Sequence, residues 1–282
     1  MKAIALVILF LGAAAAQSTD LGFDYLVLVR QWGPTFCSFN NCNNQPVAEF
    51  TIHGLWPNYA SGGYPENCDP SDKFSTNNIP TTLLNQMGCE WVSYTGTNAG
   101  FWSYEWGKHG TCALSLFPTQ EDYFDASIDL NNKYEATQAL EASNIDPATA
   151  STQPISTLQN AFKSAWGVSP VITCNGGKLF ELWLCLDTDL NAITCPSNMN
   201  YSKCSGGAAT FPQGNEVPAV CAQYYPSAND DDGSGTTSGG SGGGGGGFLP
   251  NSAAVSTIST NWMSGVMGIA MSALTVAFKM LS

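Results

Sequence analysis

Ten cysteines constrain this chain more than any other feature of its sequence. They lie between Cys37 and Cys221, away from both ends of the 282 residues, as expected if they staple one folded body. Chains this rich in cysteine are typical of oxidising compartments. Free thiols in a cytosolic core and a zinc site are the alternatives, and no two cysteines have the two-residue spacing of a zinc ribbon.

Residues 1–16 have the pattern of a secretory signal peptide. Lys2 is followed by an apolar run over 3–11 and by a stretch of small residues up to Ala16, which together make a basic start, a short apolar core and a cleavage site. The run is too short to span a bilayer comfortably, and an ordinary buried helix is the alternative. The sequon Asn200-Tyr201-Ser202 also fits secretion and makes Asn200 the expected glycosylation site.

The composition changes at the other end of the chain. Residues 229–251 are rich in Asp, Gly and Ser, which predicts a flexible linker. Residues 252–282 combine small residues, a polar spacer and a terminal apolar stretch, the pattern of a GPI-anchor signal. A retained transmembrane helix is the alternative, although no basic flank follows Lys279. We therefore expect a protein of the secretory pathway, either extracellular or held at the cell surface by a C-terminal membrane anchor.

Residues 17–228 have the composition of one globular domain. Sequence patterns predict strands over 23–32, 47–52 (ending at His53), 171–174 and 179–187, and helices over 79–88 and 121–143. Strands and helices are mixed without regular βαβ alternation, which predicts an α+β fold.

The net charge of −13 limits how the chain could bind nucleic acid. An acidic protein does not collect nucleic acid by bulk electrostatics, because affinity for the phosphate backbone comes from Lys and Arg. A nucleic-acid substrate would need a local binding site, or a working pH at which carboxylates are partly protonated.

The chain has only two histidines, and each lies in a cluster of distinctive residues. His53 opens the segment HGLWP, and His109 lies near the end of FWSYEWGKHGTC, residues 101–112. If the second segment is helical, Glu105 and His109 are four residues apart and project from one face together with Lys108. In the same helix, tryptophans at 102 and 106 are also four residues apart and could bury the helix, and the glycine at 110 could end it.

These residue types suit RNA cleavage. The 2′-hydroxyl of RNA can attack the adjacent phosphorus if a base removes its proton, and the 5′-oxygen leaves more readily if an acid protonates it. Two histidines can fill both roles at mildly acidic pH. Lys108 would stabilise charge on the phosphoryl oxygens, and Glu105 would raise the pKa of a neighbouring histidine. A two-His-one-carboxylate metal site of His53, Glu105 and His109 is the rival interpretation, which Lys108 opposes by its charge.

The two histidine segments resemble the active-site segments of the T-two family of secreted acid ribonucleases, over about residues 26–226. The resemblance implies a single domain with a central, mostly antiparallel sheet and flanking helices. It also implies a monomeric endoribonuclease that cleaves single-stranded RNA through 2′,3′-cyclic phosphate ends, with no metal or other cofactor. A surface binding protein that kept the fold and lost its activity is a further alternative.

The resemblance also assigns roles to individual residues. His109 would be the general base and His53 the general acid, although the reverse fits the sequence equally well. Glu105 and Lys108 would stabilise the transition state. The chain departs from the family at Tyr104, where a phosphate-binding histidine is usual, so we expect weaker substrate binding.

Five further residues resemble those that hold RNA bases. Trp56 matches the residue on which a base stacks, with Asn58 and Tyr64 in the same loop, although a tryptophan here could also be simply a core residue. Gln31 and Phe101 resemble the lining of a second base site.

The resemblance finally implies four disulfides, Cys37–Cys42, Cys68–Cys112, Cys174–Cys221 and Cys185–Cys195, and leaves the pairing of Cys89 and Cys204 open. The second of these would tie the loop after His53 to the end of the His109 segment. It would thereby fix the spacing of the two histidines.

Overall fold

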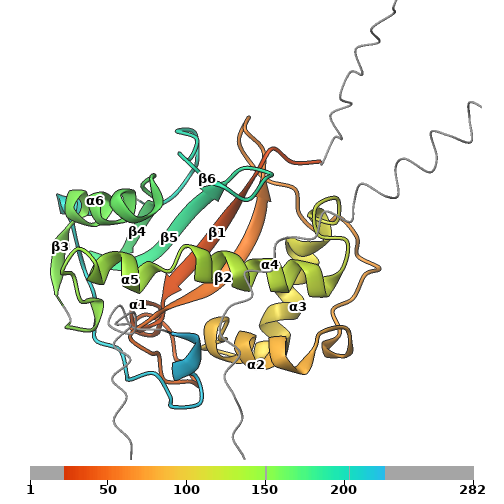
Figure 1. The fold of residues 1–282 in the computed structure, drawn as a ribbon, viewed down its shortest axis with the longest axis horizontal. Helices are drawn as coiled ribbons and strands as arrows, with labels where there is room; N and C mark the ends of the chain where they lie inside the picture. Colours follow the sequence, from red (N-terminus) through yellow and green to blue (C-terminus); the bar gives the residue numbers. More distant parts are fainter. Residues whose placement is uncertain (1–21, 150, 203, 226–282) are drawn as a thin grey trace, which may run out of the picture. The chain divides into compact units, whose positions relative to one another are not determined.

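The computed structural model shown in Figure 1 describes residues 22–149, 151–202 and 204–225. Within these ranges a seven-stranded sheet has the order β2-β1-β5-β7-β3, and β4 and β6 also pair with β5. All pairs are antiparallel except the short contact between β5 and β7. The strands are β1 (Tyr25–Trp32), β2 (Phe50–Asn58), β3 (Thr152–Pro154), β4 (Val171–Asn175), β5 (Lys178–Leu186), β6 (Ala192–Ile193) and β7 (Ala208–Thr210).

Helices flank the sheet, and α4 and α5 run across one of its faces (Figure 1). The α-helices are α1 (Gly33–Cys37), α2 (Thr81–Glu90), α3 (Asn98–Lys108), α4 (Gln120–Lys133), α5 (Ala136–Glu141) and α6 (Ile155–Trp166). Short 3-10 turns lie between these elements at Thr76–Asn78, Gly110–Cys112, Pro147–Thr149 and Ser205–Gly207, and after the last strand at Ala222–Tyr224. This architecture confirms the predicted α+β class with a mostly antiparallel sheet. The proposed signal peptide (1–16), linker (229–251) and anchor tail (252–282) lie outside the described residues.

Strand β1 is buried along its whole length because both faces of the sheet are covered there. Leu26 and Leu28 enter the main core together with aromatic side chains of the helices. Val27 and Val29 belong to a smaller cluster on the opposite face of the strand, packed against tryptophans. The polar residues of the candidate site lie on the same face of the sheet as Val27 and Val29.

Strand β2 differs from its prediction. The predicted strand 47–52 ends at His53, whereas β2 runs from Phe50 to Asn58 and contains it. Pro57 is tolerated because β2 is the edge strand of the sheet, where a missing N–H removes no necessary bond. In the pairing with β1, Val29 faces Gly54 and Arg30 faces Ile52, so His53 is the extra residue of a bulge. Such a bulge redirects the side chain that it carries.

The predicted helix 121–143 is divided into α4 and α5. Thr119 and Asp122 form a capping box at the start of α4. Glu135 interrupts the helix because its carboxylate accepts hydrogen bonds from the backbone N–H groups of Thr137 and Gln138, which caps α5. The predicted helix 79–88 corresponds to α2.

Helix α3 carries the second histidine segment. It begins at the N-cap Thr97, whose hydroxyl accepts a hydrogen bond from the N–H of Gly100, and it ends at Lys108 with His109 as C-cap. Gly110 does not have the left-handed backbone conformation with which a glycine commonly ends a helix. A Cβ at this position would lie 2.4 Å from Cε3 of Trp106, so the glycine allows the next turn to pack against that ring.

Five disulfides join all ten cysteines: Cys37–Cys42, Cys68–Cys112, Cys89–Cys221, Cys174–Cys204 and Cys185–Cys195. The expected pairing of Cys174 with Cys221 is therefore wrong. The backbone N–H of Cys174 donates to the carbonyl of Ser202, which brings the neighbouring Cys204 to strand β4. Cys221 instead lies against the end of α2, where it reaches Cys89.

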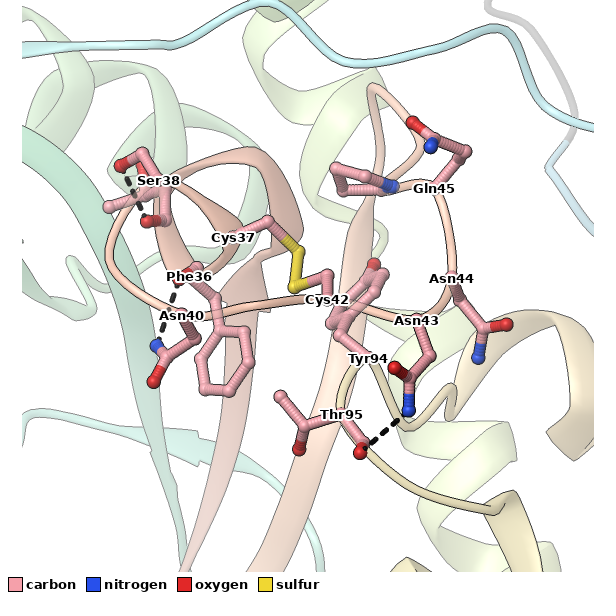
Figure 2. Close-up of a disulfide and its surroundings, with 12 residues drawn as sticks. Phe36, Cys37, Ser38, Asn40, Cys42, Asn43, Asn44, Gln45, Tyr94 and Thr95 are labelled. Atoms are coloured by element: carbon pink, nitrogen blue, oxygen red, sulfur yellow. Dashed lines mark hydrogen bonds between the residues drawn. A yellow bond between two sulfur atoms is a disulfide. The ribbon is translucent and has the colours of Figure 1, made fainter.

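Figure 2 shows the first of these bridges. Cys37–Cys42 closes the short loop after α1, and Asn43 binds this loop to the segment after α2. The backbone N–H of Asn43 donates to the carbonyl of Tyr94 (2.7 Å), and its side-chain amide donates to the carbonyl of Thr95 (2.9 Å). The bridge thereby supports the segment 92–95, which lines a pocket beside His53.

Candidate active site

His53 and Glu105 approach each other across Gly54. Nε2 of His53, on β2, lies 3.8 Å from Oε1 of Glu105, on α3. Gly54 permits this approach, because a Cβ there would lie 2.2 Å from Oε2 of Glu105 and 2.3 Å from Nε1 of Trp56. Glu105 is buried, and its Oε1 has no hydrogen-bond partner among the described residues. The arrangement leaves a buried carboxylate oxygen beside the imidazole.

A second carboxylate holds the other side of His53. Oε1 of Glu181, on β5, lies 2.8 Å from Nδ1 of His53, and Nε1 of Trp183 donates to Oε2 of Glu181 at 2.8 Å. Neither Glu181 nor Trp183 is among the residues predicted for the site. The available signal was a glutamate in the middle of the apolar strand LFELWLCLD, because a buried carboxylate needs a partner.

These neighbours set the charge of His53. Burial alone would lower the pKa of the imidazole, but the hydrogen bond to Glu181 and the negative charges of Glu105 and Glu181 outweigh it and raise the pKa above 6.5. Lys108 opposes this rise. His53 is therefore a histidine that holds its proton at mildly acidic pH.

His109 has the opposite environment. The backbone N–H of His109 donates to the backbone carbonyl of Glu105 (2.9 Å) at the end of α3, and the residue is buried. Nδ1 has no hydrogen-bond partner among the described residues. Burial, followed by the positive charges of Lys108 and His53, lowers the pKa of His109 to about 3. His109 is therefore neutral at the pH at which His53 is protonated.

Both imidazoles pack on Trp56. The ring of His109 stacks on it at a centroid distance of 5.0 Å and an interplanar angle of 24°, and the ring of His53 meets it edge-on, also at 5.0 Å. Nε1 of Trp56 donates to Oε2 of Glu105 at 2.9 Å. Trp56 is half-buried rather than enclosed in the core. It therefore joins the two histidine segments, which the sequence places far apart.

Lys108 lies beside two exposed aromatic rings. Its Nζ is 5.6 Å from the ring centroids of both Tyr64 and Tyr104, within the range of cation–π attraction. Tyr104 is 57% exposed. The position at which the family resemblance implies a phosphate-binding histidine thus carries a ring that contacts the lysine.

Two pockets flank the histidines. The first, with a volume of about 100 Å³, lies beside His53 and is lined by Gln31, Phe101 and Glu181 among others. The second pocket has a volume of about 170 Å³, and its lining includes Trp56, Asn58, Tyr64, Trp183, Asn198 and Asn200. Of the residues predicted to bind bases, Gln31 and Phe101 line the first pocket, and Trp56, Asn58 and Tyr64 line the second. The predicted glycosylation site Asn200 is an exposed residue of the second pocket.

A cluster of metal ligands and a membrane-spanning helix are both absent from the part of the chain that the structure describes. In residues 22–149, 151–202 and 204–225, no three His, Cys, Asp or Glu side chains come together in a group that could hold a metal ion. Over the same part of the chain, no helix is both long and apolar enough to cross a membrane.

Known proteins are similar to this chain in sequence and in fold. The profile of the Ribonuclease T2 family matches residues 23–195. Ribonuclease DdI of Dictyostelium discoideum is 36% identical over 219 residues, which cover 74% of this chain and 96% of that protein. Extracellular ribonuclease LE of Solanum lycopersicum is 36% identical over 188 residues, which cover 62% and 81%.

A solved structure extends this similarity to three dimensions. RNase NT in complex with 5′-AMP matches with a TM-score of 0.61 and 30% identity, over 67% of this chain and 98% of that one. The matched range 23–195 contains both histidine segments and the strand that carries Glu181. From these matches we conclude that the chain belongs to the Ribonuclease T2 family.

Proposed function

We propose that this protein is an endoribonuclease that cleaves single-stranded RNA by transphosphorylation, without a metal ion, and leaves 2′,3′-cyclic phosphate ends. The observation that carries the proposal is the pair of imidazoles on Trp56 with opposite pKa shifts. One proton acceptor and one proton donor at the same pH are what this reaction requires.

In the proposed reaction neutral His109 accepts the proton of the 2′-hydroxyl while O2′ attacks the phosphorus. The bond from phosphorus to O5′ breaks, and protonated His53 gives its Nε2 proton to O5′. The products are a 2′,3′-cyclic phosphate and a 5′-hydroxyl, and both histidines end in the opposite protonation state. The electrostatic difference favours this assignment of acid and base over the reverse.

Two neighbours stabilise the charge that develops. Lys108 supplies the positive charge for the phosphoryl oxygens, and Glu105 keeps His53 protonated from 3.8 Å away. A pKa of about 3 is low for a base that works near pH 5. The negative phosphodiester beside His109 raises this pKa when RNA binds, because an opposite charge favours the protonated form.

The two pockets hold the bases on either side of the scissile phosphate. Phe101 lies 5.8 Å from the ring of His53, which itself lines the first pocket. Tyr64, which lines the second pocket, lies 5.7 Å from the ring of His109. Aromatic walls accept any base by stacking, which suits cleavage of single strands with broad base tolerance. Binding in such a local site avoids the repulsion of an acidic protein surface.

We further propose that the enzyme acts outside the cell or at its surface as a monomer. Residues 1–16 would be removed as a signal peptide, and the tail 252–282 would be exchanged for a lipid anchor beyond the linker 229–251. A relative of similar sequence is named as an extracellular ribonuclease. Release of the protein from cells by a phosphatidylinositol-specific phospholipase tests the anchor.

The experiment that tests the activity is cleavage of single-stranded RNA at about pH 5 with EDTA present, where a two-histidine mechanism runs. Mass spectrometry of the products should show 2′,3′-cyclic phosphate ends, and His109→Ala should slow their formation by about 10²–10⁴-fold. Loss of cleavage on adding EDTA would support a metal-dependent hydrolase instead. Intact RNA with the unmodified enzyme would support a binding protein.

A further inference from the structure

Glu181 is the polar side chain of the site that the proposed reaction does not use. It lies on β5, two strands away from His53, with β1 between them. In the register of the sheet, Gln31 of β1 faces Glu181 on one side and Thr51 of β2 on the other. His53 reaches across because the bulge in β2 turns its side chain toward β5. The contact therefore depends on a specific irregularity of the sheet.

The carboxylate of Glu181 is held at both oxygens. Oε2 accepts a hydrogen bond from Nε1 of Trp183 (2.8 Å), and Oε1 lies 2.8 Å from Nδ1 of His53. The backbone N–H of Glu181 donates to the hydroxyl of Thr173 (3.0 Å), which fixes the residue from the neighbouring strand β4. The residue is only 7% exposed. A buried carboxylate fixed in this way needs a hydrogen-bond donor or a positive charge as its partner.

We propose that Glu181 is a positioning residue that accepts a hydrogen bond from Nδ1–H of His53, fixes the ring and its tautomer, and stabilises the protonated imidazole. Nε2 is then the nitrogen that faces the reacting phosphate, on the side of Glu105. This inference rests on the proposed ribonuclease function. It adds a third element, the central strand β5, to the two histidine segments that carry the reaction.

Within the part of the chain that the structure describes, the charged groups that face His53 come from two elements. Glu181 contributes one negative charge from β5, and α3 contributes Glu105 and the opposing Lys108. Glu181 is the one whose carboxylate lies within hydrogen-bond distance of the imidazole, whereas the oxygen of Glu105 is 3.8 Å away. Removal of the Glu181 charge should therefore change His53 and leave His109 nearly unaffected.

The test is Glu181→Gln in the full-length protein, because glutamine keeps the shape and loses the charge. Nitrogen-15 labelling of histidine gives signals from only two side chains, assigned with His109→Gln. We expect the pKa of His53 to fall while that of His109 stays, and kcat for RNA cleavage to fall about 10–100-fold with little change in KM. The alkaline limb of the kcat/KM profile should move to lower pH. The exposed Glu216→Gln, also a loss of one charge, should change none of these quantities.

The outcomes separate this inference from the proposed function. An unchanged pKa of His53 in folded Glu181→Gln overturns the positioning role, even if RNA is still cleaved. If the variant does not fold, the unmodified protein decides: a neutral His53 protonated at Nε2 rather than Nδ1 contradicts the inference, and the Nδ1–H form supports it. Absence of RNA cleavage by the unmodified protein overturns the function itself, whatever the pKa values are.

Discussion

The sheet side and the helix side of the site give the same residue type opposite properties. His53 lies on the sheet between two carboxylates, and its pKa is raised. His109 lies at the end of α3, buried beside Lys108, and its Nδ1 has no partner among the described residues; its pKa is lowered to about 3. The roles of acid and base therefore come from the surroundings of each histidine and not from the histidines themselves.

Replacing each histidine by alanine should have the largest effect on activity. Each variant should lose about 10²–10⁴-fold in kcat on RNA, the usual contribution of a general acid or base. A substrate with a nitrophenolate leaving group needs no acid, so it should restore the activity of His53→Ala and not that of His109→Ala. Steady-state kinetics with both substrates measures this. Restoration of His109→Ala alone would mean that the two roles are reversed.

Gly54→Ala should push the two sides apart. The new Cβ would lie 2.2 Å from Oε2 of Glu105, so the carboxylate and Trp56 must shift. We expect kcat to fall about 100-fold, the cost of roughly 1 Å of misplacement, and stability to fall by about 1–3 kcal/mol. Gly107→Ala is the matched control, because a Cβ there meets nothing within 4 Å. Denaturant unfolding and kinetics of both variants decide, and equal behaviour would contradict the expectation.

The pH profile should show the two sides separately. The base must be deprotonated, so kcat/KM should fall as the pH drops through the lowered pKa of His109, about 3. The acid must be protonated, so kcat/KM should fall as the pH rises through the raised pKa of His53, above 6.5. Beyond each limb the rate changes about tenfold per pH unit. A profile with its alkaline limb well below pH 6.5 would contradict the assignment.

Tyr104→His should have the smallest effect. A histidine at this exposed position would be protonated near pH 5 and would add a cation beside Lys108, at the cost of the ring contact. We expect KM for RNA to fall a few-fold and kcat to stay nearly constant. Because phosphate contacts depend on salt, the gain should shrink as ionic strength rises. An unchanged or higher KM would count against a phosphate-binding role for this position.

Much of the fold was readable because apolar patterns are local. The central strands β1 and β5 and helix α2 follow from runs of suitable residues, and the two histidines stand out from their neighbours. Helix α6 is not among the predicted elements, although its buried residues Leu158, Ala161 and Phe162 have the spacing of an amphipathic helix.

What escaped prediction depends on pairing between distant segments. The bulge at His53 exists only in register with β1, and the contact with Glu181 exists only once β5 lies beside β1. The partner of Cys174 likewise depended on the path of the chain near residue 204 rather than on spacing. The break between α4 and α5 escaped prediction because glutamate is ordinarily a good helix former, whereas the side chain of Glu135 here caps α5.

The bridge between Cys89 and Cys221 spans 132 residues and encloses His109 as well as two smaller bridges. A protease that cuts one peptide bond anywhere inside this span leaves two fragments still covalently attached. A nicked molecule would therefore migrate as one piece on a denaturing gel until a reductant is added, and it could keep its site assembled in surroundings rich in proteases. Damage to the chain and loss of the enzyme are separate events in such an architecture.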